Sequence, residues 1–99
     1  MRSTMQDVPL TITTILRYAS DIAGDRTVTT TTGDGGYRSI TYRELGEQAA
    51  RLANALRGVG VSGDERVATF MWNNAEHLAA YLGIPSMGAV LHTLSLIHI

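Results

Sequence analysis

The N-terminal quarter of the chain carries apolar residues at the spacing of a helix. Apolar side chains recur at three- and four-residue steps over 11–23, which places them on one helical face. We expect the Thr11 hydroxyl to cap this helix and Leu10 to pack against Ile15 as a hydrophobic staple. Gly24 then marks the end of the helix.

The pattern next changes to that of a β-hairpin. Residues 26–32 are rich in β-branched side chains, which strands favour. Residues 33–36 read Gly-Asp-Gly-Gly, a turn sequence, and 37–40 form a second short extended segment. Because the threonines at 29–32 are polar, they favour an exposed or edge strand over a core strand.

A second helix has the clearest boundaries. Thr41 and Glu44 have the spacing of a capping box, in which the Thr41 hydroxyl accepts from the Glu44 amide and the Glu44 side chain reaches back to the Thr41 amide. Leucine and alanine at helical spacing over 45–56 predict its buried face. We expect Gly58 or Gly60 to end it as a left-handed C-cap.

The last third of the chain predicts strand, helix and strand in succession. The nearly continuous apolar run over 66–72 predicts a strand covered on both faces, as in parallel sheets. Asn73 or Asn74 is placed to cap the following helix, and 89–94 predict another strand. A strand, a helix and a strand within about thirty residues indicate a βαβ unit with parallel strands.

These elements predict an α/β fold: an N-terminal helix, a β-hairpin, a capped helix and then a βαβ unit that starts a parallel sheet. A proline inside a helix costs about 3 kcal/mol, so we expect Pro85 to kink the helix before Gly88 ends it. Two sheet strands need further neighbours to bury their faces. We therefore predict an incomplete domain.

Composition excludes several classes of protein. The chain has 99 residues, a net charge of -1 and no cysteine, which argues against nucleic-acid binding, disulfide scaffolds and thiolate metal sites. All eight cationic residues are arginine, so no phosphate-binding or Schiff-base lysine is present. No apolar run approaches the ~20 residues of a membrane span, and we expect a cytoplasmic protein without a transmembrane segment.

Two glycine-rich stretches could suggest phosphate binding. Gly58, Gly60 and Gly63 match G-x-G-x-x-G, but they follow a predicted helix and precede a strand, the reverse of the dinucleotide-binding order. A helix C-terminus also presents the negative end of its dipole. We interpret this stretch as a helix C-cap and turn, and the one at 33–36 as a hairpin turn.

Histidine and aromatic residues give no catalytic pattern either. His77, His92 and His98 lack the spacing of a metal site. We expect His77 to be solvated and His92 to be a buried structural residue, with a pocket-lining role as the alternative. Phe70 and Trp72 are predicted core aromatics.

The acidic residues give no catalytic pair either. Nothing in the sequence indicates that any two of them converge, and those considered lie in predicted turns or near helix ends: Asp21, Asp25, Asp34 and Asp64. No nucleophile elbow is present. We therefore assign no catalytic, cofactor-binding or metal-binding residue to this chain.

Several stretches, taken in order, match one family pattern. They are Ser-Ile-Thr-Tyr-Arg-Glu-Leu at 39–45, the helix and turn at 49–61, Gly-Asp-Glu-Arg-Val-Ala at 63–68, Asn-Asn-Ala-Glu-His at 73–77 and the segment 80–90. In this order the chain resembles the start of the AMP-forming acyl-CoA synthetases, which belong to the adenylate-forming superfamily. The continuation at 91–94 is similar to the fatty-acyl branch.

The resemblance implies a reaction for the full-length relative. Such a ligase joins a fatty acid or another carboxylic acid to CoA while ATP is converted to AMP and pyrophosphate. It implies ATP, Mg²⁺ and CoA for the full-length relative, and none of them bound by this fragment. The family's phosphate loop and lid lysine do not occur here, so we expect the fragment to be inactive.

The likeness covers residues 8–94, which we interpret as the N-terminal portion of the large AMP-binding domain. The family pattern is lost after Leu94, so 95–99 are predicted to be a non-native tail. Two alternatives stay open. One is a complete small non-enzymatic α/β interaction module, and the other is a fragment of an adenylate-forming ligase with a different acid substrate.

Overall fold

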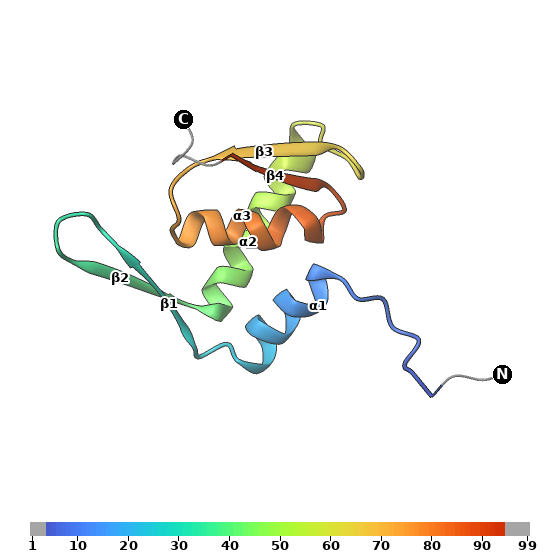
Figure 1. Cartoon of the computed structure of the whole chain (residues 1–99), viewed down its shortest axis with the longest axis horizontal. Coiled ribbons are helices and arrows are strands. Elements are labelled where there is room, and N and C mark those ends of the chain that lie inside the picture. Colours follow the sequence, from blue (N-terminus) through green and yellow to red (C-terminus); the bar gives the residue numbers. More distant parts are fainter. Residues whose placement is uncertain (1–3, 95–99) are drawn as a thin grey trace.

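The computed structural model describes residues 4–94 and confirms the predicted α/β organisation (Figure 1). The hairpin and the parallel strands form two separate two-stranded sheets. The elements follow in this order: α1 (Ile12–Arg17), the π-helical turn η1 (Tyr18–Ile22), β1 (Thr27–Thr31), β2 (Tyr37–Thr41), α2 (Tyr42–Gly58), β3 (Arg66–Phe70), α3 (Ala75–Ser86) and β4 (Val90–Leu94).

The first helix differs from its prediction at its start. The Thr11 side chain caps no amide, because its hydroxyl lies 3.3 Å from the Thr14 hydroxyl instead. The predicted staple is also wrong, since Leu10 and Ile15 are both exposed to solvent. The N-terminal segment therefore packs through other residues of the helix, among them the half-buried Leu16.

The end of this helix widens into a π turn. The Ala23 amide donates to the Tyr18 carbonyl at 3.2 Å, a bond five residues long. The buried Gly24 follows, and a Cβ added to it would lie 2.5 Å from the Ser20 carbonyl oxygen and 2.7 Å from the Arg43 guanidinium. Only a glycine fits where the chain turns from the helix into the hairpin.

The hairpin forms as predicted. Strands β1 and β2 are antiparallel, with Thr27 opposite Thr41 and Thr31 opposite Tyr37. In the connecting loop the Asp34 carboxylate accepts from the Gly36 amide at 3.0 Å. Hydrogen bonds from the Thr32 hydroxyl and the Gly36 amide hold the pKa of the Asp34 carboxyl below its ordinary value.

Local hydrogen bonds fix both ends of α2. The Thr41 hydroxyl accepts from the Glu44 amide at 3.1 Å, whereas the reverse bond of the predicted capping box is not formed. At the other end the Gly60 amide donates to Arg57 and the Val61 amide donates to Leu56, both at 3.0 Å. This is a Schellman motif, with Gly60 at φ +98°.

The βαβ unit is parallel, with Arg66 of β3 opposite Val90 of β4. Asn74 caps α3 by accepting from the His77 amide at 2.9 Å. The helix continues through Pro85 and ends at Ser86, and Gly88 then takes a φ of +89°. Pro85 has no amide hydrogen to donate, so it removes one helical hydrogen bond, and only Ser86 follows it in α3.

Among residues 4–94, only one face of the parallel sheet is covered, which corrects the prediction of a strand buried on both sides. Val67 of β3 and Leu91 of β4 pack on a core of α3 residues that includes Ile84. Phe70, on the opposite face, keeps 58% of its surface exposed. Trp72, just after β3, is 71% exposed. These aromatic residues are therefore not core residues within the described chain.

Helices α2 and α3 cross at very short range. A Cβ built on Gly83 would lie 2.9 Å from the Ala49 carbonyl oxygen and 3.3 Å from the Ala49 Cβ. Gly83 and Ala49 are both buried, so the backbones approach more closely than larger side chains would allow. Small residues at this crossing bring α3 and the sheet behind it onto α2.

The Gly83→Ala variant should destabilise the chain. The added methyl group meets backbone atoms of Ala49 that cannot rotate away, so we expect a loss of about 1–3 kcal/mol despite the better helix propensity of alanine. Urea denaturation followed by circular dichroism measures the change. Gly58→Ala is the matched control, because nothing lies within 4 Å of its added Cβ. Equal stability of the two variants would contradict this account of the crossing.

Candidate functional site

An open groove lies where the strands of the parallel sheet end. It has a volume of about 750 Å³ and is lined by β1 at 28–31, by the loop 71–74 after β3, by the α3 residues His77, Leu78 and Tyr81, and by Thr93 and Leu94. Ligands of open α/β sheets bind outside the carboxyl ends of the strands. This position makes the groove the candidate site of the described chain.

A buried hydrogen bond fixes the hairpin wall of the groove. The Thr30 hydroxyl accepts from the Ala75 amide at 3.1 Å, and both residues are buried. The Ala75 amide is one of the donors that a helix leaves unpaired in its first turn. A side chain from β1 thus supplies an acceptor to α3, forty-five positions along the chain.

A second polar contact joins the sheet to the helix. The Thr69 hydroxyl of β3 lies 3.0 Å from Nε2 of His77. Asn74 fixes the backbone of His77 through the cap of α3. The histidine is therefore half-buried and held on both sides, which corrects the prediction that it is solvated.

An ion pair also joins the hairpin to the first turn of α3, at the surface of the molecule. Arg38 of β2 donates to the Glu76 carboxylate of α3, and this hydrogen bond holds the pKa of the Glu76 carboxyl below its ordinary value. The two side chains keep 42% and 51% of their surface exposed, so water and salt screen the attraction. The pair orients the hairpin more than it stabilises the fold.

Apart from its histidine, the groove is lined by side chains that carry no charge at any ordinary pH or that titrate only at high pH. Its lining is rich in apolar and hydroxyl side chains, and its histidine is bonded to a threonine, not to an acid that could orient it as a general base. Within residues 4–94, no three histidine or acidic side chains gather closely enough to hold a metal ion. No catalytic role is assigned to the groove residues.

The other histidines considered in the sequence lie elsewhere. His92 is exposed on the sheet face that no described helix covers, so the prediction of a buried residue is wrong, and it does not line the groove. His92 is exposed because, among residues 4–94, no element packs on that face of β4. His98 lies outside the described residues.

The glycine-rich stretches occupy the places predicted for them. Gly58 and Gly60 end α2, and β3 begins at Arg66 shortly afterwards. The stretch at 33–36 is the hairpin loop. The sequence did not predict the contacts of Thr30 and Arg38 with α3. For Thr30 there was one signal, because the alternation along β1 directs its side chain to the buried side.

The comparisons with known proteins identify the family. The family model of the AMP-binding enzymes matches residues 17–97, and the chain belongs to this family. The long-chain-fatty-acid–CoA ligase of Thermus thermophilus is 41% identical over 91 residues, which are 92% of this chain and 17% of the ligase. The 3-methylmercaptopropionyl-CoA ligase of Ruegeria pomeroyi is 32% identical over 95 residues, 96% of this chain and 18% of the ligase.

A solved structure agrees with the sequence relatives. The anthranilate CoA ligase AuaEII, in complex with anthranoyl-AMP, superimposes with a TM-score of 0.77 at 27% identity, over 92% of this chain and 18% of that one. The resemblance to AMP-forming acyl-CoA synthetases is thereby confirmed. The chain spans about one sixth of the length of these relatives. None of the helices in residues 4–94 combines the length and apolar content of a membrane crossing.

Thr30→Val tests the buried bond between the hairpin and α3. Valine keeps the shape of threonine but removes the acceptor, so the buried Ala75 amide loses its partner and stability falls by about 1–3 kcal/mol. Chemical denaturation provides the measurement. Thr31→Val, at the exposed neighbouring position, should change stability by less than about 0.5 kcal/mol. A loss of similar size in both variants would sink the assignment.

Glu76→Gln tests the ion pair through its pH dependence. Because the folded-state pKa of Glu76 is lowered, its contribution is complete above the ordinary value of 4.5 and disappears as the pH falls through the lowered value. The variant should be less stable than the wild type by under about 1 kcal/mol at pH 7. The difference should shrink as the pH falls below 4.5 and disappear below the lowered pKa of Glu76, as measured by thermal unfolding. A gap that persists unchanged in acid would point to a cause other than this charge.

Proposed function

We propose that this chain is the N-terminal portion of an AMP-forming fatty-acyl-CoA ligase. The observation that carries the proposal is the family match over 17–97, together with 41% identity to the Thermus fatty-acid ligase across most of the chain. The whole enzyme would convert a fatty acid, ATP and CoA to acyl-CoA, AMP and pyrophosphate.

The proposed reaction proceeds in two displacements. A carboxylate oxygen of the acid attacks the α-phosphorus of ATP, and the bond to pyrophosphate breaks to give an acyl-adenylate. The CoA thiol then loses its proton and attacks the acyl carbon, so that AMP leaves with the bonding electron pair. Both steps need donors preorganised around phosphate and carbonyl oxygens where negative charge develops.

The described residues do not supply those donors. The chain has no lysine, and within 4–94 no group of acidic or histidine side chains forms a ligand set for Mg²⁺. The glycine-rich stretch after α2 lies at the negative end of the helix dipole, which disfavours phosphate. We therefore assign the chain a structural role and propose that by itself it neither binds ATP nor catalyses the reaction.

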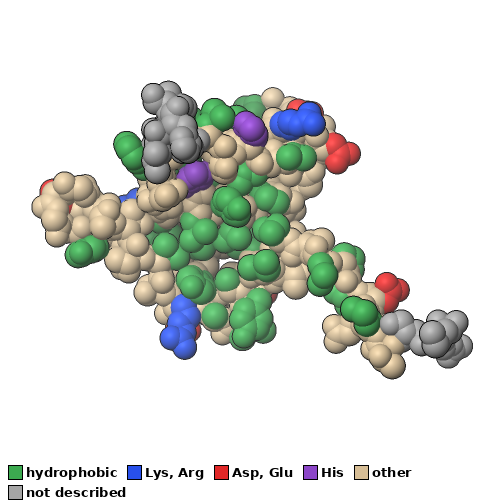
Figure 2. All heavy atoms as spheres, in the orientation of Figure 1, with side chains coloured by type: hydrophobic (Ala, Val, Ile, Leu, Met, Phe, Trp, Pro, Cys, Tyr) green, Lys and Arg blue, Asp and Glu red, His purple; other side chains and the backbone are tan. Residues whose placement is uncertain are grey.

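The exposed apolar residues favour the interpretation as part of a larger domain and argue against a small interaction module. A module should show one bounded apolar patch on an otherwise polar surface. Here large apolar side chains are exposed in several places, including Leu10 and Ile22 near the N-terminus, Tyr37 on the hairpin and Phe70 on the sheet. Figure 2 shows apolar side chains both over the main body and along the N-terminal segment.

The acid substrate is the finer part of the proposal. A fatty acid is favoured because the Thermus relative is the more similar of the two ligases compared over nearly the whole chain. The Ruegeria and AuaEII relatives are named for a short thioether acid and an aromatic acid. A ligase for another class of carboxylic acid is therefore the second candidate.

The full-length gene provides the test. We expect the genomic sequence to continue the frame of residues 8–94 into a Gly/Ser/Thr-rich segment with a lysine. The expressed protein should release AMP and form a CoA thioester with fatty acids, and do so much more slowly with 3-methylmercaptopropionate and anthranilate. Preference for either of the latter acids would select the second candidate. A frame without such a segment, or a folded product that releases no AMP, would reject both.

A further inference from the structure

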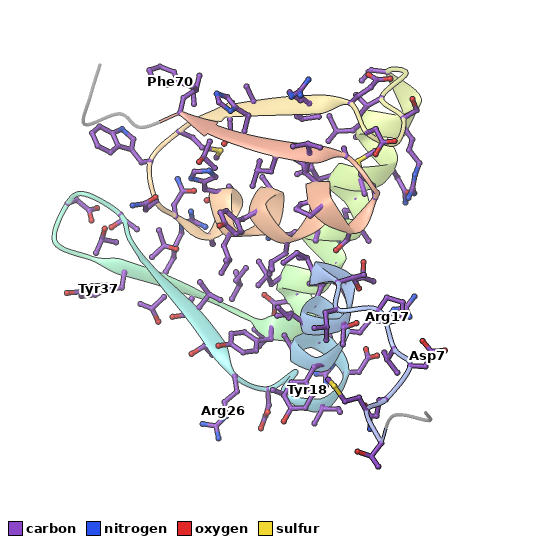
Figure 3. The ribbon with its side chains drawn as sticks, turned by 45° about the vertical axis from the view of Figure 1, so that its right-hand side comes forward. Asp7, Arg17, Tyr18, Arg26, Tyr37 and Phe70 are labelled. Atoms are coloured by element: carbon purple, nitrogen blue, oxygen red, sulfur yellow. The ribbon has the colours of Figure 1, made fainter. Side chains whose placement is uncertain are left out.

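The hairpin loop at 33–36 presents an aspartate followed by a glycine to solvent. Asp34 and Gly35 are both exposed, and no other aspartate of the chain precedes a glycine. A Cβ built on Gly35 would meet nothing within 4 Å. Figure 1 shows the hairpin projecting from the body of the molecule, and in Figure 3 the labelled Tyr37, where β2 begins, points away from the helices. The backbone at Gly35 is therefore open on this side.

Such a pair can isomerise without an enzyme, because glycine has no side chain to shield its backbone nitrogen. The Gly35 nitrogen attacks Cγ of the protonated Asp34 carboxyl and forms a C–N bond. One carboxyl oxygen leaves as water, taking the amide proton and the acid proton, and a five-membered succinimide remains. Water then adds to the succinimide and breaks one of its two C–N bonds. When the bond to the main-chain carbonyl breaks, the chain continues through the side chain as isoaspartate, with a free α-carboxylate and an unchanged mass.

Two hydrogen bonds restrain the Asp34 carboxylate in the folded loop. Its Oδ1 accepts from the Gly36 amide at 3.0 Å and from the Thr32 hydroxyl. A Cβ built on Gly36 would lie 3.1 Å from this oxygen and 3.1 Å from the Thr32 hydroxyl oxygen, so the two side chains meet directly over Gly36. Hydrogen bonds to an aspartate from its own neighbouring backbone are typical of turns. Both donors stabilise the ionised carboxylate, which the amide nitrogen attacks far less readily than the acid.

We propose that Asp34 is the isoaspartate-forming site of this chain and that the hydrogen bond from the Thr32 hydroxyl slows the reaction. The proposal depends on the hairpin loop and goes beyond the proposed function. Without the Thr32 hydroxyl, the carboxyl group is held by the Gly36 amide alone. It then takes up its proton and turns toward the Gly35 nitrogen more often, so the rate of ring closure rises.

Isomerisation would change the geometry of the loop. The Thr32 amide donates to the Gly36 carbonyl at 3.1 Å, and Thr31 pairs with Tyr37 one step further along the hairpin. Isoaspartate places one additional carbon in the backbone between these closing residues, and its free carboxylate no longer has the position of an aspartate side chain. That free α-carboxylate is the group that isoaspartyl carboxyl methyltransferases modify. An enzyme of this class is the partner that fits the isomerised loop.

Ageing of the 99-residue chain at neutral pH tests the site. Trypsin cleaves after Arg26 and Arg38 and releases the peptide 27–38, in which Asp34 is the only acidic residue and no asparagine occurs. An isomer of this peptide with unchanged mass therefore reports on Asp34 alone. We expect the isomer to accumulate with time, to separate from the parent peptide by chromatography and to accept a methyl group from an isoaspartyl methyltransferase.

Substitutions at Thr32 test the restraint. Thr32→Val should speed isomerisation about two- to tenfold, the range expected for the loss of one hydrogen bond. Thr32→Ser keeps a hydroxyl and should stay near the wild-type rate. Thr31→Val, at the exposed neighbouring position, is the matched control and should leave the rate unchanged. In concentrated guanidinium chloride the folded loop is lost, so Thr32→Val and the wild type should isomerise equally fast.

Each remaining outcome counts against the proposal. Absence of isoaspartate from the peptide 27–38 in both the wild type and Thr32→Val overturns the site, as does faster isoaspartate formation at another aspartate of the chain. Equal rates for Thr32→Val and Thr31→Val in the folded chain overturn the role of the hydroxyl. So does an acceleration by Thr32→Val that persists in denaturant, because it would arise from the local sequence and not from the folded loop. None of these results bears on the activity of the full-length gene product.

Discussion

The short crossing between α2 and α3 is the constraint on which the rest of the structure depends. Gly83 lies against the backbone of Ala49, with no room for even one methyl group. Helix α3 is also the crossover between β3 and β4, so its position on α2 sets the position of the parallel sheet. A close approach of two backbones gains many weak dispersion contacts at once, and a single added carbon loses them.

The N-terminus of α3 joins the hairpin to the parallel sheet. Its first-turn amides are paired by Asn74 within the helix and by Thr30 from the hairpin, and Glu76 meets Arg38 at the surface. These contacts hold β1 beside the carboxyl ends of β3 and β4, and the groove is the space left between them. A polar helix terminus thus positions the hairpin.

The structural role that we propose for this chain fits the chemistry of an adenylate-forming ligase. The reaction needs charged donors around a triphosphate and a reactive acyl carbon. This chain belongs to the AMP-binding family, and its described residues present packed alanines, capped helices and a sheet with one open face. We propose that its contribution is geometric, because residues that handle phosphate can be held precisely only on strands and helices that are themselves fixed.

Local chemistry made much of this fold predictable from sequence. The Thr41 and Asn74 caps, the Gly60 C-cap and the hairpin loop follow from side chains that bond their own neighbouring backbone, so each could be predicted without its surroundings. The parallel βαβ unit followed from the order of apolar segments, and the family followed from the order of the matching stretches.

Tertiary packing decided the remainder. The contacts of Thr30 with Ala75 and of His77 with Thr69 join distant parts of the chain, and nothing in the local pattern names the partner. Phe70 lies in an apolar stretch that predicts a core position, but its side chain is exposed. Burial depends on which layers surround a strand and not on the strand itself. Sequence thus determined the elements and their ends, whereas contacts between elements determined the groove and the open face.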